Sequence, residues 1–394
     1  MNNIYRGFVA AFIAFSSLSS VAADPFAGIV SEVLSNNPEL KAERHRLDAG
    51  VAAERAENML ADPTVDFSYK WGPAEAGDKI EAGISQEFDW PGVYGARRRA
   101  VAVADSAARE LLRGKQLDCA LQVRLLLIDI VNCRSRLDLV REAVDNLDGL
   151  ARSKAVAFEH GEATVFDIKN IEMRRLSLSL RAADTESQLD ALKASLFAMN
   201  GGKYIDTDSL TDYPDDVLHE ESYYLEILEN SEPALRAGRF GAEAARGRMR
   251  VERMKRLPGF SVGYNFVREG GANFNGLSVG LRLPVWSKAD AVKAAELLAE
   301  AESDGLAALM ADRRAAVVSD YAAARRLAAR CEGFRQIMGS EKEYNRLLRK
   351  ALDGGSMTML QYLAELANFI DLRTEYLNLR YSYALALARL NRNQ

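Results

Sequence analysis

The side chains that most often carry out catalysis or bind metals are sparse in this sequence. Three histidines and three cysteines occur among 394 residues, and no group of His, Cys, Asp and Glu residues has the spacing of a metal site. Neither a phosphate-binding loop nor a nucleophile elbow occurs, and no set of general acid, base and nucleophile emerges. The net charge of −5 is mild and suggests no nucleic-acid partner. We therefore predict no enzyme activity, no cofactor and no bound metal.

Polar residues at fixed spacing occur instead at two breaks in helical patterns. Gly161 suits a helix C-terminus and Thr164 an N-cap, and Asp167 three residues later imitates a capping box. The pattern returns 194 positions further on, where Gly355 and Thr358 match Gly161 and Thr164. These residues predict two sharp turns, after each of which a helix returns.

The two breaks belong to an internal repeat that covers most of the chain. The sequence NPEL at 37–40 resembles EPAL at 232–235, and Pro63 and Pro258 are likewise 195 positions apart. The chain is therefore one unit used twice, in the order helix, hairpin, very long helix, helix.

Each repeat contains two segments in which apolar and polar residues alternate with the period of a β-strand. The first pair occupies 63–90 around a Gly/Pro turn, and the second occupies 258–284 around a Gly-Gly turn. One set of alternate positions holds Val65, Phe67, Tyr69, Trp71, Ile80, Ala82, Ile84, Gln86 and Phe88 in the first hairpin, and Phe260, Val262, Tyr264, Phe266, Leu277, Val279, Leu281 and Leu283 in the second.

Most of the remaining sequence favours long helices. Apolar residues recur at helical spacing over 91–160, a rod of about 100 Å at about 1.5 Å per residue. A second rod is expected at 287–352. Shorter helices are predicted at 25–61 with an interruption near Pro38, at 165–199, at 222–256 and after the second break. The first and second short helices together nearly match the first rod in length, so they can stack end to end beside it.

Two segments fall outside the repeats. Residues 1–23 combine a positive charge at Arg6, a short apolar run and a Val-Ala-Ala cleavage site, which predicts a signal peptide; a membrane span would need about 20 apolar residues. Residues 201–222 are rich in Asp and Glu and are typical of a solvated linker, with a short strand near Tyr204. The predicted units are a signal peptide (1–23), a first repeat (24–200), the acidic linker (201–222) and a second repeat (223–394).

The three cysteines do not predict a disulfide framework. Cys119 and Cys133 lie 14 positions apart on one expected helix, about 21 Å at the helical rise, which excludes a bond between them. Cys331 falls opposite position 137 of the first repeat, so a contact with Cys133 is conceivable. Buried free thiols at helix contacts are the alternative.

The four strands fit the wall of a membrane barrel. About nine residues at about 3.3 Å each, tilted by about 40°, cover about 23 Å, and the apolar band of an outer-membrane barrel is about 25 Å tall. A soluble two-sided sheet explains the hairpins equally well. If the strands span a membrane, four are too few to close a barrel, so several copies must each contribute a sector. Aromatic residues that suit interfacial girdles stand at the strand ends: Trp71, Phe88, Trp90 and Trp286.

At these residues the sequence resembles the TolC family of outer-membrane efflux proteins. The string ISQEFDWPG at 84–92, followed by Arg97, Arg98 and Arg99, is echoed by VGLRLPVW at 279–286, and the resemblance covers nearly all of the mature chain. It implies a mainly α fold with a small β part, in which four strands per chain join a trimeric twelve-strand β-barrel above a long periplasmic α-helical barrel. It also implies a homotrimer in outer-membrane lipid that docks to a periplasmic adaptor and an inner-membrane pump. The tryptophan-proline-glycine string with its arginines is most similar to the branch with heavy-metal and drug efflux subunits.

The resemblance also assigns roles to residues at the two turns, 158–167 and 352–361. They would form the periplasmic tip, which closes the tunnel and contacts the adaptor. Asp167 matches a position that helps to hold the closed state, although a charge favoured by the helix dipole explains it as well. Gln361 and Ala364 stand where the best-known members carry cation-attracting aspartates. The tip set is Gly161, Thr164, Asp167, Asp353, Gly355, Thr358, Gln361 and Glu365, with Asp353 and Glu365 as substitutes for the missing aspartates.

The arginines after the first hairpin have two interpretations. Arg97, Arg98 and Arg99 could contact lipid phosphates at the inner rim of the membrane, or they could face solvent with Glu87 and Asp89 as ion-pair partners. The predicted membrane-interface set is Trp71, Phe88, Trp90, Trp286, Arg97 and Arg98.

Two functions follow from these patterns. The first is a passive outer-membrane exit duct for small molecules or ions, drugs or metal cations, delivered by an inner-membrane pump. The second is a periplasmic coiled-coil scaffold or adaptor without channel activity. They differ in whether the hairpins contact lipid, and the sequence does not specify the substrate.

Overall fold

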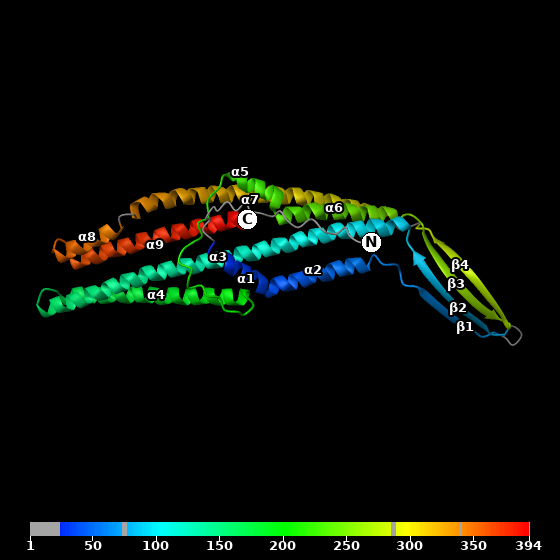
Figure 1. Ribbon diagram of the computed structural model, residues 1–394, viewed down its shortest axis with the longest axis horizontal. Helices are drawn as coiled ribbons and strands as arrows, with labels where there is room; N and C mark the ends of the chain where they lie inside the picture. The colour runs from blue at the N-terminus through cyan, green and yellow to red at the C-terminus, as the bar shows by residue number, and fades with distance from the viewer. Residues whose placement is uncertain (1–23, 73–76, 285–288, 339–340, 394) are drawn as a thin grey trace, which may run out of the picture.

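A rod of helices with a four-stranded sheet at one end makes up the chain (Figure 1). The computed structural model describes residues 24–72, 77–284, 289–338 and 341–393. The predicted signal peptide and Trp286 lie outside the described residues. Among the described residues no helix is both long and apolar enough to cross a membrane.

The first repeat has the predicted order of elements. The break at Pro38 separates two helices because Asn37 accepts the backbone N–H of Leu40 and Pro38 takes the first helical position, where no N–H is needed. The elements are α1 (Ala27–Asn36), α2 (Pro38–Ala56), β1 (Thr64–Lys70), β2 (Lys79–Phe88), α3 (Pro91–Glu159) and α4 (Val165–Met199).

The second repeat follows the same order with one further break. The helix predicted at 222–256 is two helices, because Pro233 starts a new one as Pro38 does in the first repeat. The rod predicted at 287–352 is described as α7 and α8, with residues 339 and 340 between them outside the description. The short strand predicted near Tyr204 does not form. The elements are α5 (Glu221–Ser231), α6 (Pro233–Met254), β3 (Gly259–Glu269), β4 (Ala272–Arg282), α7 (Ala289–Met338), α8 (Glu341–Asp353), α9 (Met359–Leu390) and the 3-10 turn η1 (Asn391–Asn393).

The sheet joins the two repeats. Its antiparallel strands lie in the order β1-β2-β3-β4, so the first hairpin pairs with the second through β2 and β3. The turn between β3 and β4 consists of Gly270 and Gly271, with φ of 55° and 85°. A two-residue hairpin turn with both φ values positive favours glycine and matches the twist of the strands.

The helices pack along the rod rather than around one centre: α1, α2, α4, α6 and α9 lie on α3, and α7 lies on α6 and α9. Figure 1 shows α4 beside one half of α3 and α1 and α2 beside the other half, as their lengths predict. At the sheet end, α6 packs so closely on α3 that a Cβ added to Gly247 would lie 2.9 Å from the Cβ of Ala100. The two larger apolar clusters lie around Phe26, Val123, Leu127, Leu196 and Ala388 and around Leu147, Ile171, Leu178, Leu363 and Ile370, and a smaller one at the sheet end joins Val93 and Ala96 of α3 to Val251 of α6.

The cysteines are free thiols. Cys119 and Cys133 are buried in α3 and Cys331 is half-buried in α7. Burial raises the pKa of all three thiols. A raised pKa keeps a thiol protonated and unreactive near neutral pH. The alternative of buried free thiols is therefore confirmed for Cys119 and Cys133, and Cys331 is free but half-buried.

Candidate functional site

One face of the sheet is mostly apolar across all four strands; its polar residues are Gln86, Arg268, Asn273 and Asn275. Directly paired residues of an antiparallel sheet share a face. Val65 lies opposite Ile84, Ile84 opposite Tyr264, and Tyr264 opposite Leu277. This face is uncovered in the chain, with Leu277 84% and Val279 80% exposed. So large an apolar surface on a folded protein marks a contact with lipid or with another chain.

The opposite face of the sheet is polar or small except at Val267 and Phe274, which pair with each other beside Glu81. It carries Ser68 and Glu81 on the first hairpin and Ser261 and Ser278 on the second. A Cβ added to Gly263 on this face would lie 2.7 Å from Ser278 Oγ and 2.9 Å from the Ile84 carbonyl oxygen, so glycine is needed where the strands approach. A sheet with one apolar and one polar face suits a wall between lipid and water.

The two edges of the sheet are open. β1 and β4 each pair with one neighbour among the described residues. Because β1 and β3 run in the same direction and β4 runs against β3, the two edge strands are antiparallel to each other. The β4 edge of one copy could therefore pair with the β1 edge of another as an antiparallel neighbour, so that strand directions would still alternate across the joined sheet.

The predicted interface aromatics lie at both ends of the first hairpin. Trp71 follows β1 and Trp90 precedes α3, and both are exposed. Phe88 ends β2 and stacks on Phe260 with ring centroids 5.1 Å apart.

The arginines after the hairpin differ in their contacts. Arg97 donates to the Glu57 carbonyl oxygen at 3.1 Å and lies 3.6 Å from an Asp89 carboxylate oxygen. Arg282 of β4 binds Glu87 and Asp89 at 3.0 Å and 2.7 Å. Arg98 lines a cavity below the hairpin. Arg97 thus has protein partners, whereas Arg98 lines the cavity without a partner among the described residues.

The two predicted turns have the same structure. Gly161 and Gly355 end α3 and α8 with φ of 76° and 72°. The N–H of Glu162 donates to the Ala157 carbonyl at 2.8 Å, and the N–H of Ser356 donates to the Ala351 carbonyl at 3.0 Å. This is the Schellman arrangement, in which glycine allows the left-handed residue that closes the helix.

A capping box follows each turn. The Thr164 hydroxyl accepts the N–H of Asp167 at 3.1 Å, and Asp167 accepts the N–H of Thr164 at 2.9 Å. Thr358 and Gln361 make the same two contacts at 3.2 Å and 2.9 Å. Figure 1 shows both turns at the end of the rod opposite the sheet.

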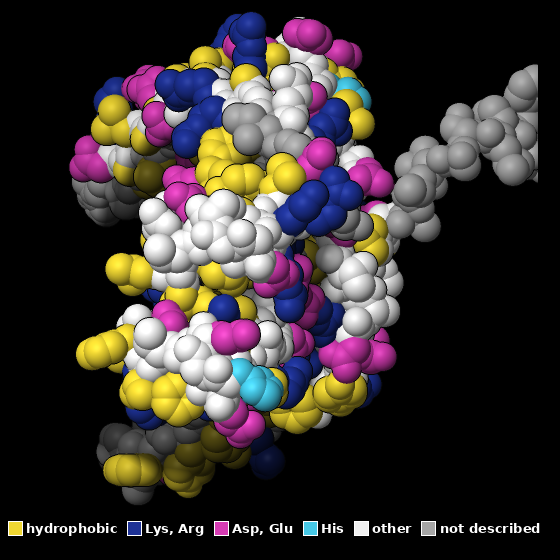
Figure 2. All heavy atoms as spheres, turned by 90° about the vertical axis from the view of Figure 1, so that its left-hand side faces the viewer, with side chains coloured by type: hydrophobic (Ala, Val, Ile, Leu, Met, Phe, Trp, Pro, Cys, Tyr) yellow, Lys and Arg dark blue, Asp and Glu magenta, His cyan; other side chains and the backbone are white. Residues whose placement is uncertain are grey.

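The other predicted tip residues are placed differently. Asp353 is exposed at the end of α8, whereas Glu365 accepts a hydrogen bond from the Tyr344 hydroxyl at 3.0 Å. Burial, followed by this hydrogen bond, raises the pKa of Tyr344. Figure 2 looks onto this end and shows acidic, basic and hydrophobic side chains interspersed. Phe166 beside the first turn is 80% exposed.

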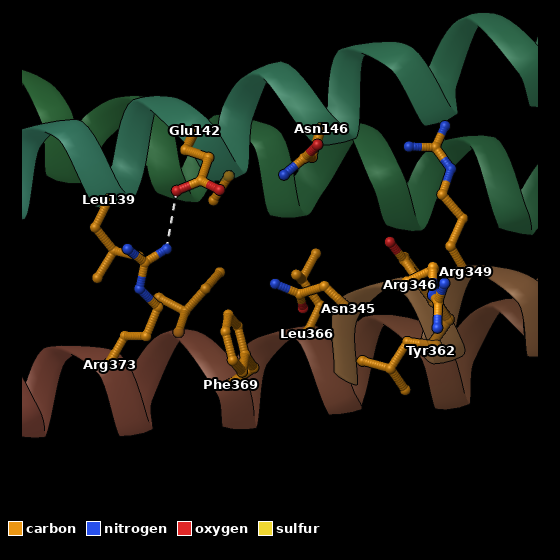
Figure 3. Close-up of a pocket in the computed structure, with 13 residues that line it drawn as sticks. Leu139, Glu142, Asn146, Asn345, Arg346, Arg349, Tyr362, Leu366, Phe369 and Arg373 are labelled. Atoms are coloured by element: carbon orange, nitrogen blue, oxygen red, sulfur yellow. Dashed lines mark hydrogen bonds and ion pairs between the residues drawn. The ribbon is translucent and has the colours of Figure 1, made fainter. Parts of the chain in front are cut away.

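A cavity of about 310 Å³ lies between α3, α8 and α9 near the turns (Figure 3). Glu142 of α3 reaches across it to Arg373 of α9 at 2.8 Å. Arg346 and Arg349 of α8 also line it, and burial raises the pKa of the neighbouring Tyr362. No motif in the sequence pointed to this cavity, because its walls come from helices about 200 residues apart in the chain. Among the described residues, no three His, Cys, Asp or Glu side chains are placed to hold a metal ion.

Comparisons with known proteins found a matching sequence family and similar solved structures. Residues 224–393 match the outer membrane efflux protein family. The solved structure of CusC is similar, with a TM-score of 0.76 and 14% sequence identity, and the match covers 92% of this chain and 90% of CusC. VceC of Vibrio cholerae has a TM-score of 0.74 and 14% identity, and the match covers 93% of this chain and 95% of VceC. The CmeC outer membrane channel of Campylobacter jejuni has a TM-score of 0.73 and 16% identity, and the match covers 93% of this chain and 84% of CmeC. No curated protein sequence matches the chain significantly.

The resemblance to the TolC family of outer-membrane efflux proteins is confirmed. The second repeat carries the sequence pattern of the outer membrane efflux protein family, and the chain as a whole has the fold of its channels. The predicted fold class, mainly helical with four strands in a duplicated TolC-like unit, is confirmed as well. In a TolC-like chain, the uncovered sheet and the pair of turns are the two ends of one elongated unit.

Proposed function

We propose that three copies of this chain form an exit duct in the outer membrane, through which small molecules or ions leave passively. The observation that supports this most strongly is the sheet, which has one uncovered apolar face and two open edges. Four strands cannot close a barrel, since about eight are the fewest that do so. Three copies would supply twelve strands with their apolar faces toward lipid and their polar faces toward water.

The dimensions of the chain fit this arrangement. The 10 residues of β2, at about 3.3 Å each and a tilt of about 40°, span about 25 Å, which equals the apolar band of an outer-membrane barrel. The 69 residues of α3 extend about 100 Å from the sheet. The helices would therefore form a tunnel in the periplasm, and the signal peptide predicted at 1–23 would direct the chain there.

The duct would act with a periplasmic adaptor and an inner-membrane pump. A passive channel needs no catalytic residues, and the pump supplies the energy. The adaptor would meet the end that carries the two turns, where Phe166 and Leu360 are exposed. The exported compounds would be drugs or metal cations chosen by the pump.

Membrane fractionation and conductance test this proposal. We expect the full-length chain in the outer-membrane fraction, as an oligomer whose mobility on gels changes on heating. Reconstituted in planar bilayers, it should conduct ions when the tip opens. A water-soluble monomer in the periplasm would contradict the duct and favour a coiled-coil scaffold or adaptor.

A further inference from the structure

A second cavity lies where the first hairpin meets the helices. It has a volume of about 870 Å³ and is formed by the segment between α2 and β1 together with the first turns of α3. Its lining includes Arg55, Met59, Asp62, Gln86 and Arg98. Nothing in the duct function described above uses this cavity.

The cavity opens on the apolar face of the sheet. Gln86 lies between Ile84 and Phe88 on alternate positions of β2, so its side chain shares their face. Its Nε2 donates to the Ala61 carbonyl oxygen at 2.5 Å, which holds the loop before β1 against that face. Since β2 ends at Phe88, the cavity lies at the helical end of the sheet. If the apolar face contacts lipid, this height corresponds to the headgroups of the leaflet that faces the periplasm.

Two charged groups of the lining have no protein partner. Among the residues that the structure describes, neither Arg98 nor Asp62 forms an ion pair or a side-chain hydrogen bond. Asp105, by contrast, is held by Arg109 at 3.1 Å and 3.2 Å. The cavity therefore offers one free guanidinium and one free carboxylate.

Apolar side chains flank these charges. Met59 is 74% exposed, and the neighbouring Leu60 is also exposed. Exposed apolar side chains next to an unpaired cation are typical of a site at a membrane interface.

We propose that this cavity binds the headgroup of a phospholipid with a primary ammonium, phosphatidylethanolamine. The guanidinium of Arg98 would donate hydrogen bonds to the phosphate, and the carboxylate of Asp62 would accept them from the ammonium. Met59 and Leu60 would contact the first carbons of the acyl chains. This inference rests on the proposed membrane location of the sheet.

Native mass spectrometry of the purified oligomer tests the proposal. The oligomer is stripped of lipid and exposed to equal amounts of phosphatidylethanolamine, phosphatidylcholine and phosphatidylglycerol. We expect the wild-type oligomer to retain phosphatidylethanolamine preferentially, since a choline headgroup has no N–H to donate and a glycerol headgroup has no positive charge. Equal retention of the three lipids, or of phosphatidylglycerol and phosphatidylethanolamine, would overturn it.

Substitutions locate the site. Arg98→Gln should reduce retention of phosphatidylethanolamine about tenfold, as expected for the loss of a charge-assisted hydrogen bond. Asp62→Asn should abolish the preference over phosphatidylcholine. Arg99→Gln is the matched control, because Arg99 is the adjacent residue of α3 and does not line the cavity. Unchanged retention in Arg98→Gln, or an equal loss in Arg99→Gln, would overturn the proposal.

The experiments distinguish failure of the lipid site from failure of the proposed duct. An oligomer that conducts ions but shows no lipid preference would leave the duct intact and overturn only the lipid site. A cavity filled by a neighbouring copy would give this result. A water-soluble monomer would overturn both.

Discussion

Asp167 and Gln361 cap two helices in the same way from equivalent positions of the two repeats. Each side chain accepts the backbone N–H of the threonine three residues before it, at 2.9 Å in both cases. One of the two is charged and the other is neutral. The capping contact therefore does not require a charge, and the charge of Asp167 can be tested apart from its role in the cap.

Asp167→Asn should keep the cap and remove the charge. The amide oxygen can still accept the N–H of Thr164, so we expect the stability to fall by no more than about 1 kcal/mol, the worth of a charge at a helix N-terminus. If the charge helps to hold the tip closed, single-channel conductance in planar bilayers should rise. Thr164→Ala removes the cap at a cost of about 1 kcal/mol in stability and keeps the charge of Asp167. It therefore shows how far a less stable turn by itself changes the conductance. Unchanged conductance in Asp167→Asn would leave this residue a helix cap only.

Charges on the apolar face of the sheet should impair assembly. Val279→Arg should reduce the yield of membrane-inserted oligomer, because an arginine facing the middle of the bilayer costs about 2–4 kcal/mol per chain. Ser278→Arg, one position along β4 and on the polar face, should assemble normally. The amount of oligomer in outer-membrane extracts measures both. Equal yields would show that the faces of the sheet are assigned wrongly.

A buried ion pair joins the end of the chain to the break between α5 and α6. Glu232, 2% exposed, accepts hydrogen bonds from Arg392 at 3.0 Å and 3.1 Å. Arg392→Met should lower the free energy of unfolding by about 3–5 kcal/mol, since it leaves a buried carboxylate with no cation and only the Asn393 amide as a side-chain donor. Urea unfolding followed by circular dichroism measures the change.

Two further variants control for this effect. Arg389→Met, at an exposed position of the last turn of α9, should change little. Adding Glu232→Leu to Arg392→Met should recover much of the loss, because the uncompensated charge is gone. If Arg392→Met is as stable as the wild type, the ion pair does not stabilise the junction between α5 and α6.

Tyr381 should make the rod sensitive to alkali. Burial, together with its hydrogen bond to Asp129 at 2.7 Å, raises the pKa of Tyr381 from 10.0 to about 12. Between these values the unfolded tyrosine has lost its proton and the folded one keeps it. The contribution of Tyr381 to stability should therefore be fully present below pH 10 and be lost as the pH rises toward 12. Tyr381→Phe should show a shallower loss of melting temperature over this range than the exposed control Tyr204→Phe. Parallel curves would contradict the shift.

Local patterns predicted most of the elements. Prolines at strand and helix starts, alternation in the hairpins and the Thr164–Asp167 spacing each depend on neighbours within a few residues, and each corresponds to an observed element or cap. The break at Pro233 was missed although the matching Pro38 was recognised. A proline at the first helical position leaves the apolar periodicity on both sides intact.

Long-range contacts could not be predicted from such patterns. Glu232 and Arg392 are 160 residues apart, and the pairing of Ile84 with Tyr264 depends on how the two hairpins dock. By sequence alone, Arg97 and Arg98 have the same two possible roles. In the structure Arg97 lies beside Asp89, whereas Arg98 lines a cavity. Which of two adjacent side chains finds a partner is decided by tertiary packing, and the sequence around it carries no record of that packing.

Disulfide cross-linking between sheet edges tests the central claim most directly, namely that copies of the chain pool their strands. Cysteine pairs are introduced along β1, at Val65 or Phe67, and along β4, at Leu277 or Val279, and intact cells are oxidised. Because the edge of β4 should pair with β1 of the next copy, at least one combination is predicted to give bands of two and three chains and none larger. Bands of a single chain from every combination, in protein that is nevertheless folded, would contradict the account.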